Sequence, residues 1–259
     1  MDSAPDRDPA REVALRSALG TRRIGRMVYA YGVVVSTMDL AHGLAAADSP
    51  EGTLICAVEQ MDGRGRQGRR WVSAPGGLYC SVILRPQVPL ERAPQLALVA
   101  GLAAAEAIRS LTGLVPWVRW PNDLLLSGRK VGGTLVEARG GAVVVGQGIN
   151  VTAEHDLLPD TATSLAASGA EDVDLVALTA AWCGALESWY DRWITDGFEP
   201  IRQALRSRMA FFGDPIHLQR GEGRVEGTAT DLDEAGRLIV RLDSGVLQAF
   251  DMGEVTRVR

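Results

Sequence analysis

A short segment rich in glycine and arginine is the part of the sequence best suited to bind an anion. Residues 59–71 read EQMDGRGRQGRRW, with three glycines and four arginines between Gly63 and Arg70. Glycine lets backbone N–H groups turn toward a ligand, and arginine offers a forked set of donors that matches carboxylate or phosphate. The flat ring of Trp71 suits stacking on a purine or packing in a core. The segment predicts a site for a small anion or a nucleotide, with a solvated basic turn and a nucleic-acid contact as the alternatives.

Two further groups combine polar residues with glycines. The first spans residues 119–123, which read RWPND, and residues 128–137, which read GRKVGGTLVE. The second is residues 146–150, which read GQGIN. A Pro-Asn-Asp sequence is a turn signal. Its functional interpretation is that Asn122 and Asp123 end a strand beside a ligand, where the Asp123 carboxylate helps to bind Mg²⁺. Lys130 precedes two glycines that allow a ligand to approach the strand, although a lone lysine in a hairpin is more often an ordinary surface residue.

Alternating strands and helices are expected to position these groups. A β-like stretch over residues 27–35 is followed by Ser36, whose side chain is predicted to cap a helix that runs to about Ala47. Pro94 suits the first turn of a long helix that ends near Leu111. Further strands are predicted over residues 53–58, 78–84, 118–120, 124–126, 131–138 and 142–149, and further helices over residues 173–193 and 199–207.

The two ends of the chain differ from the middle in composition and in the pattern of expected elements. Residues 1–23 are predicted to be a polar leader that contains one short helix at most, and residues 24–210 form the main domain. Residues 211–259 contain short β-like segments divided by glycine and acidic turns, which predicts a small antiparallel barrel. These segments are residues 215–219, 224–230, 237–242, 246–250 and 254–258.

Composition indicates an ordinary globular protein. The chain has 259 residues, of which 46% are hydrophobic, and its formal net charge of -5 argues against a nucleic-acid binder with a wholly cationic surface. Cys56, Cys80 and Cys183 form no CxxC pair, so reduced thiols are expected, and the scattered histidines predict no zinc site. No stretch has the pattern of a signal peptide or of a membrane span. We therefore expect a soluble, cytoplasmic protein that binds neither membrane nor nucleic acid.

Together, in their order and spacing, these motifs resemble those of biotin protein ligases. Ser36 and Thr37 are similar to the family's Ser-Thr-Asn element, and residues 59–69 resemble its glycine-arginine biotin-binding loop. Residues 120–123, 128–133 and 148–150 resemble the rest of its catalytic set, and residues 253–255 look like its last barrel strand. The resemblance implies an α+β fold, with a mixed β-sheet and packed helices as in lipoate ligases and class II synthetases, plus a small C-terminal SH3-like β-barrel.

The resemblance also implies an activity with two half-reactions. Biotin and ATP give biotinyl-5′-AMP and pyrophosphate, and a lysine of a biotin carboxyl carrier domain of an acyl-CoA carboxylase such as acetyl-CoA carboxylase then displaces AMP. Biotin, ATP and Mg²⁺ are the implied small molecules, and the protein is expected to be a monomer or a homodimer.

Site residues follow from the resemblance position by position. Lys130, Arg64 and Arg66 are expected to be catalytic, and Asp123 is expected to bind the metal. The residues expected at biotin are Ser36, Thr37, Met38, Gln60, Gly63, Arg64, Gly65, Arg66, Lys130 and Gly133. The residues expected at the nucleotide are Arg66, Arg69, Trp71, Asn122, Lys130, Gly148 and Asn150.

Two positions depart from the family pattern, and several rival functions stay open. Met38 stands where the family usually has asparagine, and Arg119 stands where a lysine is common. A forked guanidinium and a point-charge ammonium need not bind alike. The rivals are a lipoate or octanoate ligase, a bifunctional ligase and repressor, and a biotin-binding module without activity. A repressor is disfavoured because only about 25 residues precede the resemblance, fewer than a helix-turn-helix domain needs.

Overall fold

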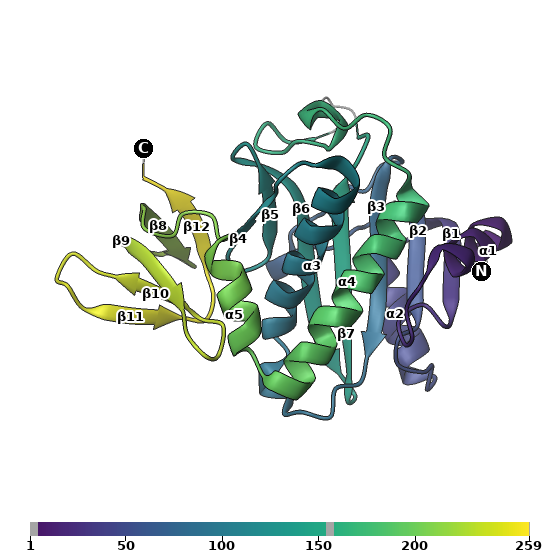
Figure 1. The fold of residues 1–259 in the computed structure, drawn as a ribbon, viewed down its shortest axis with the longest axis horizontal. Helices are drawn as coiled ribbons and strands as arrows, with labels where there is room; N and C mark the ends of the chain where they lie inside the picture. The colour runs from purple at the N-terminus through teal and green to yellow at the C-terminus, as the bar shows by residue number, and fades with distance from the viewer. Residues whose placement is uncertain (1–4, 154–157, 259) are drawn as a thin grey trace.

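A seven-stranded sheet forms the middle layer of the larger domain in the computed structural model, which describes residues 5–153 and 158–258 (Figure 1). Its strand order is β1-β2-β3-β7-β6-β5-β4. Strand β1 pairs with β2 in parallel, and every other neighbouring pair is antiparallel. The strands are β1 (Val28–Val34), β2 (Leu54–Gln60), β3 (Gly77–Leu84), β4 (Trp117–Arg119), β5 (Asp123–Leu126), β6 (Arg129–Arg139) and β7 (Ala142–Asn150).

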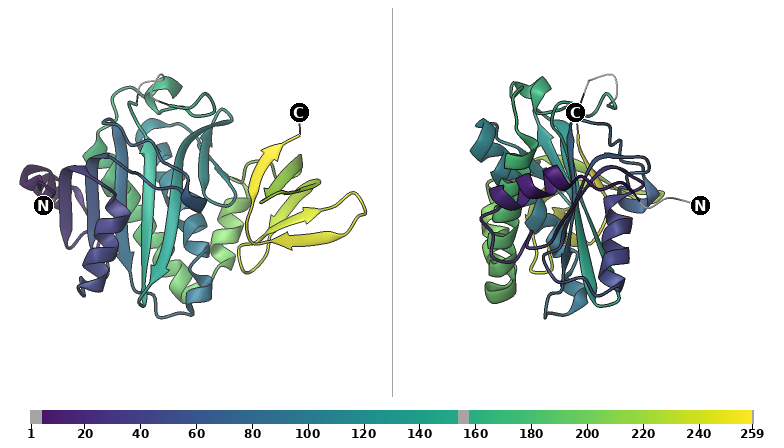
Figure 2. Two further views of the ribbon diagram at one scale, coloured as in Figure 1. Left: turned by 180° about the vertical axis from the view of Figure 1, so that it is seen from behind. Right: turned by 90° about the vertical axis from the view of Figure 1, so that its right-hand side faces the viewer.

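Helices cover both faces of this sheet. Helix α2 (Thr37–Ala46) lies on one face, while α3 (Gln95–Thr112) and α4 (Leu175–Asp196) lie together on the other (Figure 2). The side chains of α3 are mostly alanine and leucine, and twelve of its eighteen residues are buried, so the helix approaches the sheet closely. Gly113, with φ of 74°, ends α3, and the Asp174 side chain accepts hydrogen bonds from the first N–H groups of α4.

The predicted strands and helices of the main domain are confirmed, apart from shifts of a few residues at their ends. One local expectation is wrong. Ser36 occupies the N-cap position of α2, but its side chain makes no capping hydrogen bond. Its hydroxyl is instead buried without a protein partner. The stretch over residues 151–170, which carried few sequence signals, contains a single short 3₁₀ helix, Ala166–Ser168, among its described residues.

Residues near the N-terminus form a helix that belongs to the core. Helix α1 (Pro9–Ala18) buries Leu15, and its Glu12 binds Arg7 and the backbone N–H of Ala30. The segment that follows is held by Glu187 of α4, which accepts hydrogen bonds from the backbone N–H groups of residues 22–24 at 2.7 to 2.8 Å. The segment expected to be a polar leader therefore packs on β1 and α4, and its first four residues lie outside the described part.

The C-terminal region is a five-stranded antiparallel sheet that packs beside the main domain through α5 (Glu199–Arg206) (Figure 1). All five predicted strands are present, in the order β11-β10-β9-β8-β12. The Trp120 indole donates to the carbonyl of Gly236 at 3.0 Å, and Gln95 donates to that of Glu234 at 2.9 Å. The strands are β8 (Pro215–Arg220), β9 (Gly223–Leu232), β10 (Leu238–Arg241), β11 (Leu247–Phe250) and β12 (Glu254–Arg257).

The cysteines are free thiols, as expected. Cys56 and Cys80 are cross-strand partners in β2 and β3, with their sulfur atoms 2.9 Å apart, and burial raises the pKa of Cys56 well above its usual value. Within the described residues, no helix is both long and apolar enough to cross a membrane.

Candidate active site

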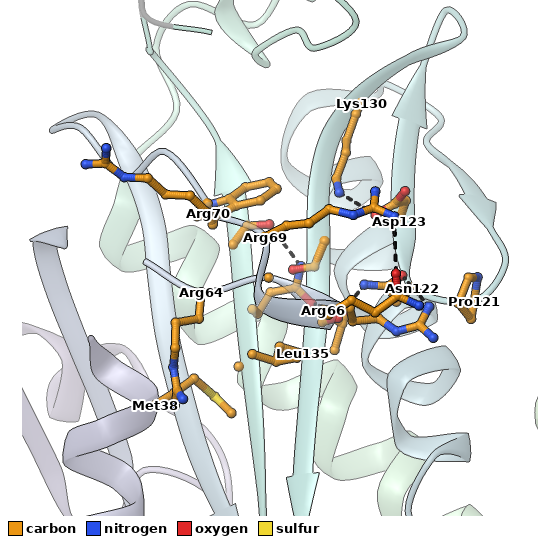
Figure 3. Close-up of a pocket in the computed structure, with 18 of the residues that line it drawn as sticks. Met38, Arg64, Arg66, Arg69, Arg70, Pro121, Asn122, Asp123, Lys130 and Leu135 are labelled. Atoms are coloured by element: carbon orange, nitrogen blue, oxygen red, sulfur yellow. Dashed lines mark hydrogen bonds and ion pairs between the residues drawn. The ribbon is translucent and has the colours of Figure 1, made fainter. Parts of the chain in front are cut away.

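A cavity of about 140 Å³ lies over strands β6 and β7, on the side of the sheet that carries α2 (Figure 3). The glycine-arginine segment forms one wall, and the turn before β5 with the start of β6 forms another. Residues 253–255, at the start of the last strand of the C-terminal sheet, close the remaining side. The cavity is therefore built from both domains.

The glycine-arginine segment folds back on itself. The N–H of Gly65 donates to the carbonyl of Arg69, and the N–H of Trp71 donates to that of Gly63, both at 2.7 Å. A 3₁₀ turn over Arg66–Gly68 reverses the chain between them, with Gln67 at φ of 57°. This turn spreads the four arginine side chains in different directions around the cavity.

A hydrogen-bonded polar cluster lines one end of the cavity. The Gln60 side-chain oxygen accepts from the Thr37 N–H at 2.8 Å and from the Thr37 hydroxyl at 3.0 Å. The amide nitrogen of Gln60 donates to Ser73, and Ser81 donates to the Thr37 hydroxyl. These side chains hold one another in fixed orientations, which suits recognition of a small ring that carries N–H and C=O groups.

The floor of the cavity is nearly free of side chains because glycines lie on β6 and β7. A Cβ on Gly148 would lie 2.7 Å from the Trp71 ring, and one on Gly146 would lie 2.6 Å from the Met38 sulfur. The indole of Trp71 and the thioether of Met38 therefore lie directly on the bare backbone of β7. Met38 is buried, so this departure from the family pattern supplies apolar surface to the cavity.

An acidic residue lies between two cations at the opposite end. Asp123 Oδ1 is 2.5 Å from Lys130 Nζ, and Asp123 Oδ2 is 2.6 Å from Arg119 Nη2 (Figure 3 labels Asp123 and Lys130). Burial alone would raise the pKa of the Asp123 carboxyl, but the charges and hydrogen bonds of Lys130 and Arg119 outweigh burial and lower that pKa. Lys130 also lies over the face of Trp71, 5.1 Å from the ring centre.

The same arrangement bears on Mg²⁺. A metal ligand needs lone pairs that face the ion, whereas both oxygens of Asp123 face cationic groups. No cluster of three histidine, cysteine or acidic side chains suited to a metal occurs in the described part of the chain. The side chains of this pocket, as arranged here, therefore do not fit a protein-held Mg²⁺.

The arginines of the loop differ in their partners. Arg66 points toward Asn122, with Nη1 3.4 Å from its side-chain oxygen, and burial lowers the pKa of Arg66. Arg64 points away from this cationic end, toward Met38, and is paired with Asp39 at 2.7 Å and Glu137 at 3.5 Å. Arg69 reaches Glu254 of the last strand at 2.8 Å. Arg66, through Asn122, and Lys130, through Asp123, are thus both anchored at the Asn122–Asp123 end of the cavity.

Most of the predicted site residues meet in this cavity, and three do not line it. Asn150 is buried with its amide bound to the carbonyl of Thr163, Gly63 packs against Ser73, and Ser36 is buried at the start of α2. Those that line it are Thr37, Met38, Gln60, Arg64, Gly65, Arg66, Arg69, Trp71, Asn122, Asp123, Lys130, Gly133 and Gly148.

Several lining residues were missed as site residues, although the motifs already contained some of them, namely Arg119, Trp120, Pro121, Gly146 and Gln147. Leu135 and Gly146 carry a signal, because each lies two residues from a predicted site glycine and so shares its face of the strand. Glu254 had none beyond its place in the last strand, since only the fold brings it to the loop. The other missed lining residues are Gln67, Arg70, Cys80, Arg119, Trp120, Pro121, Thr134, Gln147, Gly253 and Val255.

Comparison with known protein families gives two matches along the chain. Residues 31–153 match the Biotin/lipoate A/B protein ligase family, and residues 211–257 match the Biotin protein ligase C terminal domain. The first match contains every predicted site residue, and the second contains the strand that closes the cavity.

Individual relatives agree with these matches. The chain is 34% identical to the Bifunctional ligase/repressor BirA of Bacillus subtilis, over 92% of this chain and 77% of that protein. It is 34% identical to the Biotin--[acetyl-CoA-carboxylase] ligase of Paracoccus denitrificans, over 80% of this chain and 90% of that protein.

A solved structure of the biotin protein ligase from Aquifex aeolicus in complex with biotin and ATP superposes with a TM-score of 0.79. It is 28% identical and covers 90% of this chain and 99% of that chain. Fold, pocket and sequence thus agree, and the chain belongs to the biotin protein ligase family.

Proposed function

We propose that the cavity between the glycine-arginine loop and strands β6 and β7 carries out both half-reactions of an ATP-dependent biotin protein ligase. The observation that carries this assignment is the polarity of the cavity. A neutral hydrogen-bonding cluster around Gln60 lies at one end, and a cationic cluster around Lys130 lies at the other. Biotin has the same polarity, with a ureido ring at one end and a carboxylate at the other.

In the first half-reaction, an oxygen of the biotin carboxylate attacks the α-phosphorus of ATP, and the bond from that phosphorus to the bridging oxygen breaks to release pyrophosphate. Both reactants are anions, so positive charge is required where they meet. Lys130 and Arg66 supply it in our assignment, and the backbone N–H groups of the loop add donors. Arg64, which is engaged by Asp39 and Glu137, orders the loop from its other side.

We assign the nucleotide to the space between Trp71 and Asn122. The Trp71 side chain is partly exposed, and its flat ring suits stacking against adenine. Asn122 is oriented by its own hydrogen bond to the carbonyl of Thr134 at 2.8 Å. Arg69 completes this part of the assignment, and Gly148 serves it by letting the Trp71 ring lie on strand β7. Mg²⁺ does not fit the Asp123 carboxylate in this arrangement, so no step of the proposal passes through a metal.

In the second half-reaction, the neutral amine of an acceptor lysine attacks the carbonyl carbon of biotinyl-5′-AMP. An amide bond forms, the bond to the AMP oxygen breaks, and the amine loses a proton. We propose a biotin carboxyl carrier domain as the acceptor, which the name of the Paracoccus denitrificans relative supports. A cytoplasmic location is consistent with three free thiols. Independence from nucleic acid, and a monomeric or homodimeric state, stay predictions.

The test is a complete reaction. Protein, ATP, Mg²⁺, biotin and a biotin carboxyl carrier domain are mixed, and the carrier is weighed by mass spectrometry. We expect a gain of one biotinyl group on one lysine, and no gain without ATP. Lipoate is offered in place of biotin as the competing substrate of the wider family. A carrier that gains lipoyl but not biotinyl groups would contradict the proposal.

A further inference from the structure

Asp123 forms ion pairs with Lys130 and Arg119. Lys130 has an assigned role toward the substrates, whereas Arg119 has none so far. It lies on β4, directly opposite Asp123 of β5 in the strand register. Its Nη2 and Nε atoms lie 2.6 and 3.2 Å from Asp123 Oδ2. Lys130 uses the other oxygen, Oδ1. The carboxylate is therefore shared between two cations that arrive from opposite sides, one from each neighbouring strand.

The two cations differ in how firmly they are held. The Arg119 side chain is only 18% exposed and makes two hydrogen bonds to a single acceptor across a strand pair. The Lys130 side chain is 30% exposed and reaches Asp123 through its single ammonium group, whereas both side chains line the cavity. Its backbone is fixed by hydrogen bonds to Thr161 and Thr163 at 2.9 and 2.8 Å, so movement is confined to the flexible side chain.

Space for that movement is present beside Gly133. A Cβ at Gly133 would lie 3.4 Å from Lys130 Cε and 3.5 Å from Asp123 Oδ1. The glycine thus leaves the space of a small side chain empty beside both the ammonium and the carboxylate, and the Lys130 side chain can shift into it. On its other side the ammonium faces the Trp71 ring, which attracts it by a cation–π interaction without the directional hydrogen bond that the carboxylate accepts.

We propose that Arg119 is a positioning residue that stays on Asp123 and neutralises it, so that Lys130 can leave Asp123 for the anionic substrates. This inference rests on the proposed function, since the anions are the biotin carboxylate and the α-phosphate. Without Arg119, Lys130 would be the sole close counter-ion of a mostly buried carboxylate, and its release would leave that charge unpaired. With Arg119 in place, Asp123 keeps a partner after Lys130 departs.

Other charged groups near the pair do not replace Arg119. Arg66 contributes to the field at Asp123, but its hydrogen bond goes to Asn122. Arg69 is paired with Glu254. Between them, Lys130, Arg119 and Asp123 carry a net charge of one positive unit, which the proposal assigns to the substrate. A neutral residue at position 119 lowers that total to zero.

The test is a double-mutant cycle with two readouts. The variants are Arg119→Gln, Arg119→Lys, Asp123→Asn and the Arg119→Gln/Asp123→Asn double variant. Arg237→Gln is the matched control, because Arg237 forms the same arginine–aspartate pair four residues apart, with Asp233, away from the cavity. The readouts are biotin-dependent ATP–pyrophosphate exchange, and binding of inorganic pyrophosphate by calorimetry in buffer without Mg²⁺.

We expect Arg119→Gln to lower exchange and to weaken pyrophosphate binding by about tenfold or more, the order of effect of one lost charge in a partly buried site. Arg119→Lys should recover most of the loss, and Arg237→Gln should match the wild type. The double variant should exceed Arg119→Gln in both readouts, because removing Asp123 frees Lys130. A purely structural role for Arg119 would instead make the double variant as poor as Arg119→Gln or poorer.

Two results would overturn the proposal: Arg119→Gln within about twofold of the wild type in both readouts, or a double variant no better than Arg119→Gln. A wild-type protein whose variants bind pyrophosphate in the expected order, but which shows no biotin-dependent exchange, would support the role of Arg119 and refute the proposed function. The two claims therefore fail separately.

Discussion

Replacing Gly148 with alanine should weaken nucleotide binding by pushing the Trp71 ring off strand β7. A Cβ at this position would lie 2.7 Å from Cε2 and Nε1 and 2.9 Å from Cζ2 of the indole. Ordinary carbon contacts lie at about 3.5–4.0 Å, so the shortfall is roughly 0.8 Å. The strand cannot retreat, because Gly148 is paired with Tyr79 on one side and Gly133 on the other. The ring must therefore move.

Such overpacking costs about 1–3 kcal/mol in well-packed sites. If the nucleotide binds only when the ring is in place, the dissociation constant for ATP should rise by about 5- to 150-fold. Isothermal calorimetry with ATP, in the presence of saturating biotin, measures this change. The affinity for biotin alone should change less, since the Gln60 cluster lies at the other end of the cavity.

A control and a rescue separate this effect from general damage. Gly184→Ala, on α4, places a Cβ with no atom within 4 Å and should leave ATP affinity unchanged. In a Trp71→Leu background, the Gly148→Ala change should add little, because the obstructing ring is gone. An ATP affinity within twofold of the wild type for Gly148→Ala, or an undiminished effect in the Trp71→Leu background, would refute the reasoning.

Three further predictions test other parts of the structure. Lys130→Ala should lower biotinyl-AMP formation by at least about 100-fold while the melting curve stays near that of the wild type; normal pyrophosphate release would contradict its role. Glu187→Gln should lower the free energy of unfolding by about 1–3 kcal/mol, because an amide has one acceptor oxygen for the backbone N–H groups of residues 22–24. Burial opposes ionisation of Glu187, but those hydrogen bonds outweigh burial and lower its pKa. Its contribution should be complete above the unfolded value of about 4.3 and be lost as the pH falls through the lower folded value, so urea titrations of wild type and variant should converge only below the folded pKa. The exposed Glu171→Gln serves as the control there, and a gap that persists at low pH would contradict the assignment. Glu254→Gln should change the KM for ATP by less than about fivefold, because its partner Arg69 is more than half exposed and such pairs contribute about 0.2–1 kcal/mol; a larger loss in initial-rate assays would show that the pair does more than close the wall.

Local patterns predicted the elements well because each has its own signal. The short strands of the C-terminal sheet are divided by glycine turns, and the long helix α3 begins just after Pro94 and ends at Gly113. The cap at Ser36 failed for a physical reason. Ser36 is almost fully buried and its hydroxyl has no hydrogen-bond partner, a tertiary setting that a local capping pattern does not reveal.

The site was predicted less completely than the fold. Gln60, Arg66, Trp71 and Lys130, which the motifs singled out, line one cavity, but motif spacing could not show which charges pair. The link between Arg119, Asp123 and Lys130 depends on three strands lying side by side in one register. Asp123 therefore looked like a free carboxylate in the sequence, although its oxygens are both engaged in the fold.

The wall formed by residues 253–255 has a consequence for the order in which the protein is made. During synthesis the glycine-arginine loop emerges from the ribosome long before β12, since more than 180 residues separate Arg69 from Glu254. A nascent chain that has completed the seven-stranded sheet still holds a cavity open on one flank. An incomplete chain that formed the adenylate in an open cavity would lose it to hydrolysis and would consume ATP without product. Placing the last wall in the last strand delays closure of the cavity until the C-terminal sheet has emerged and folded.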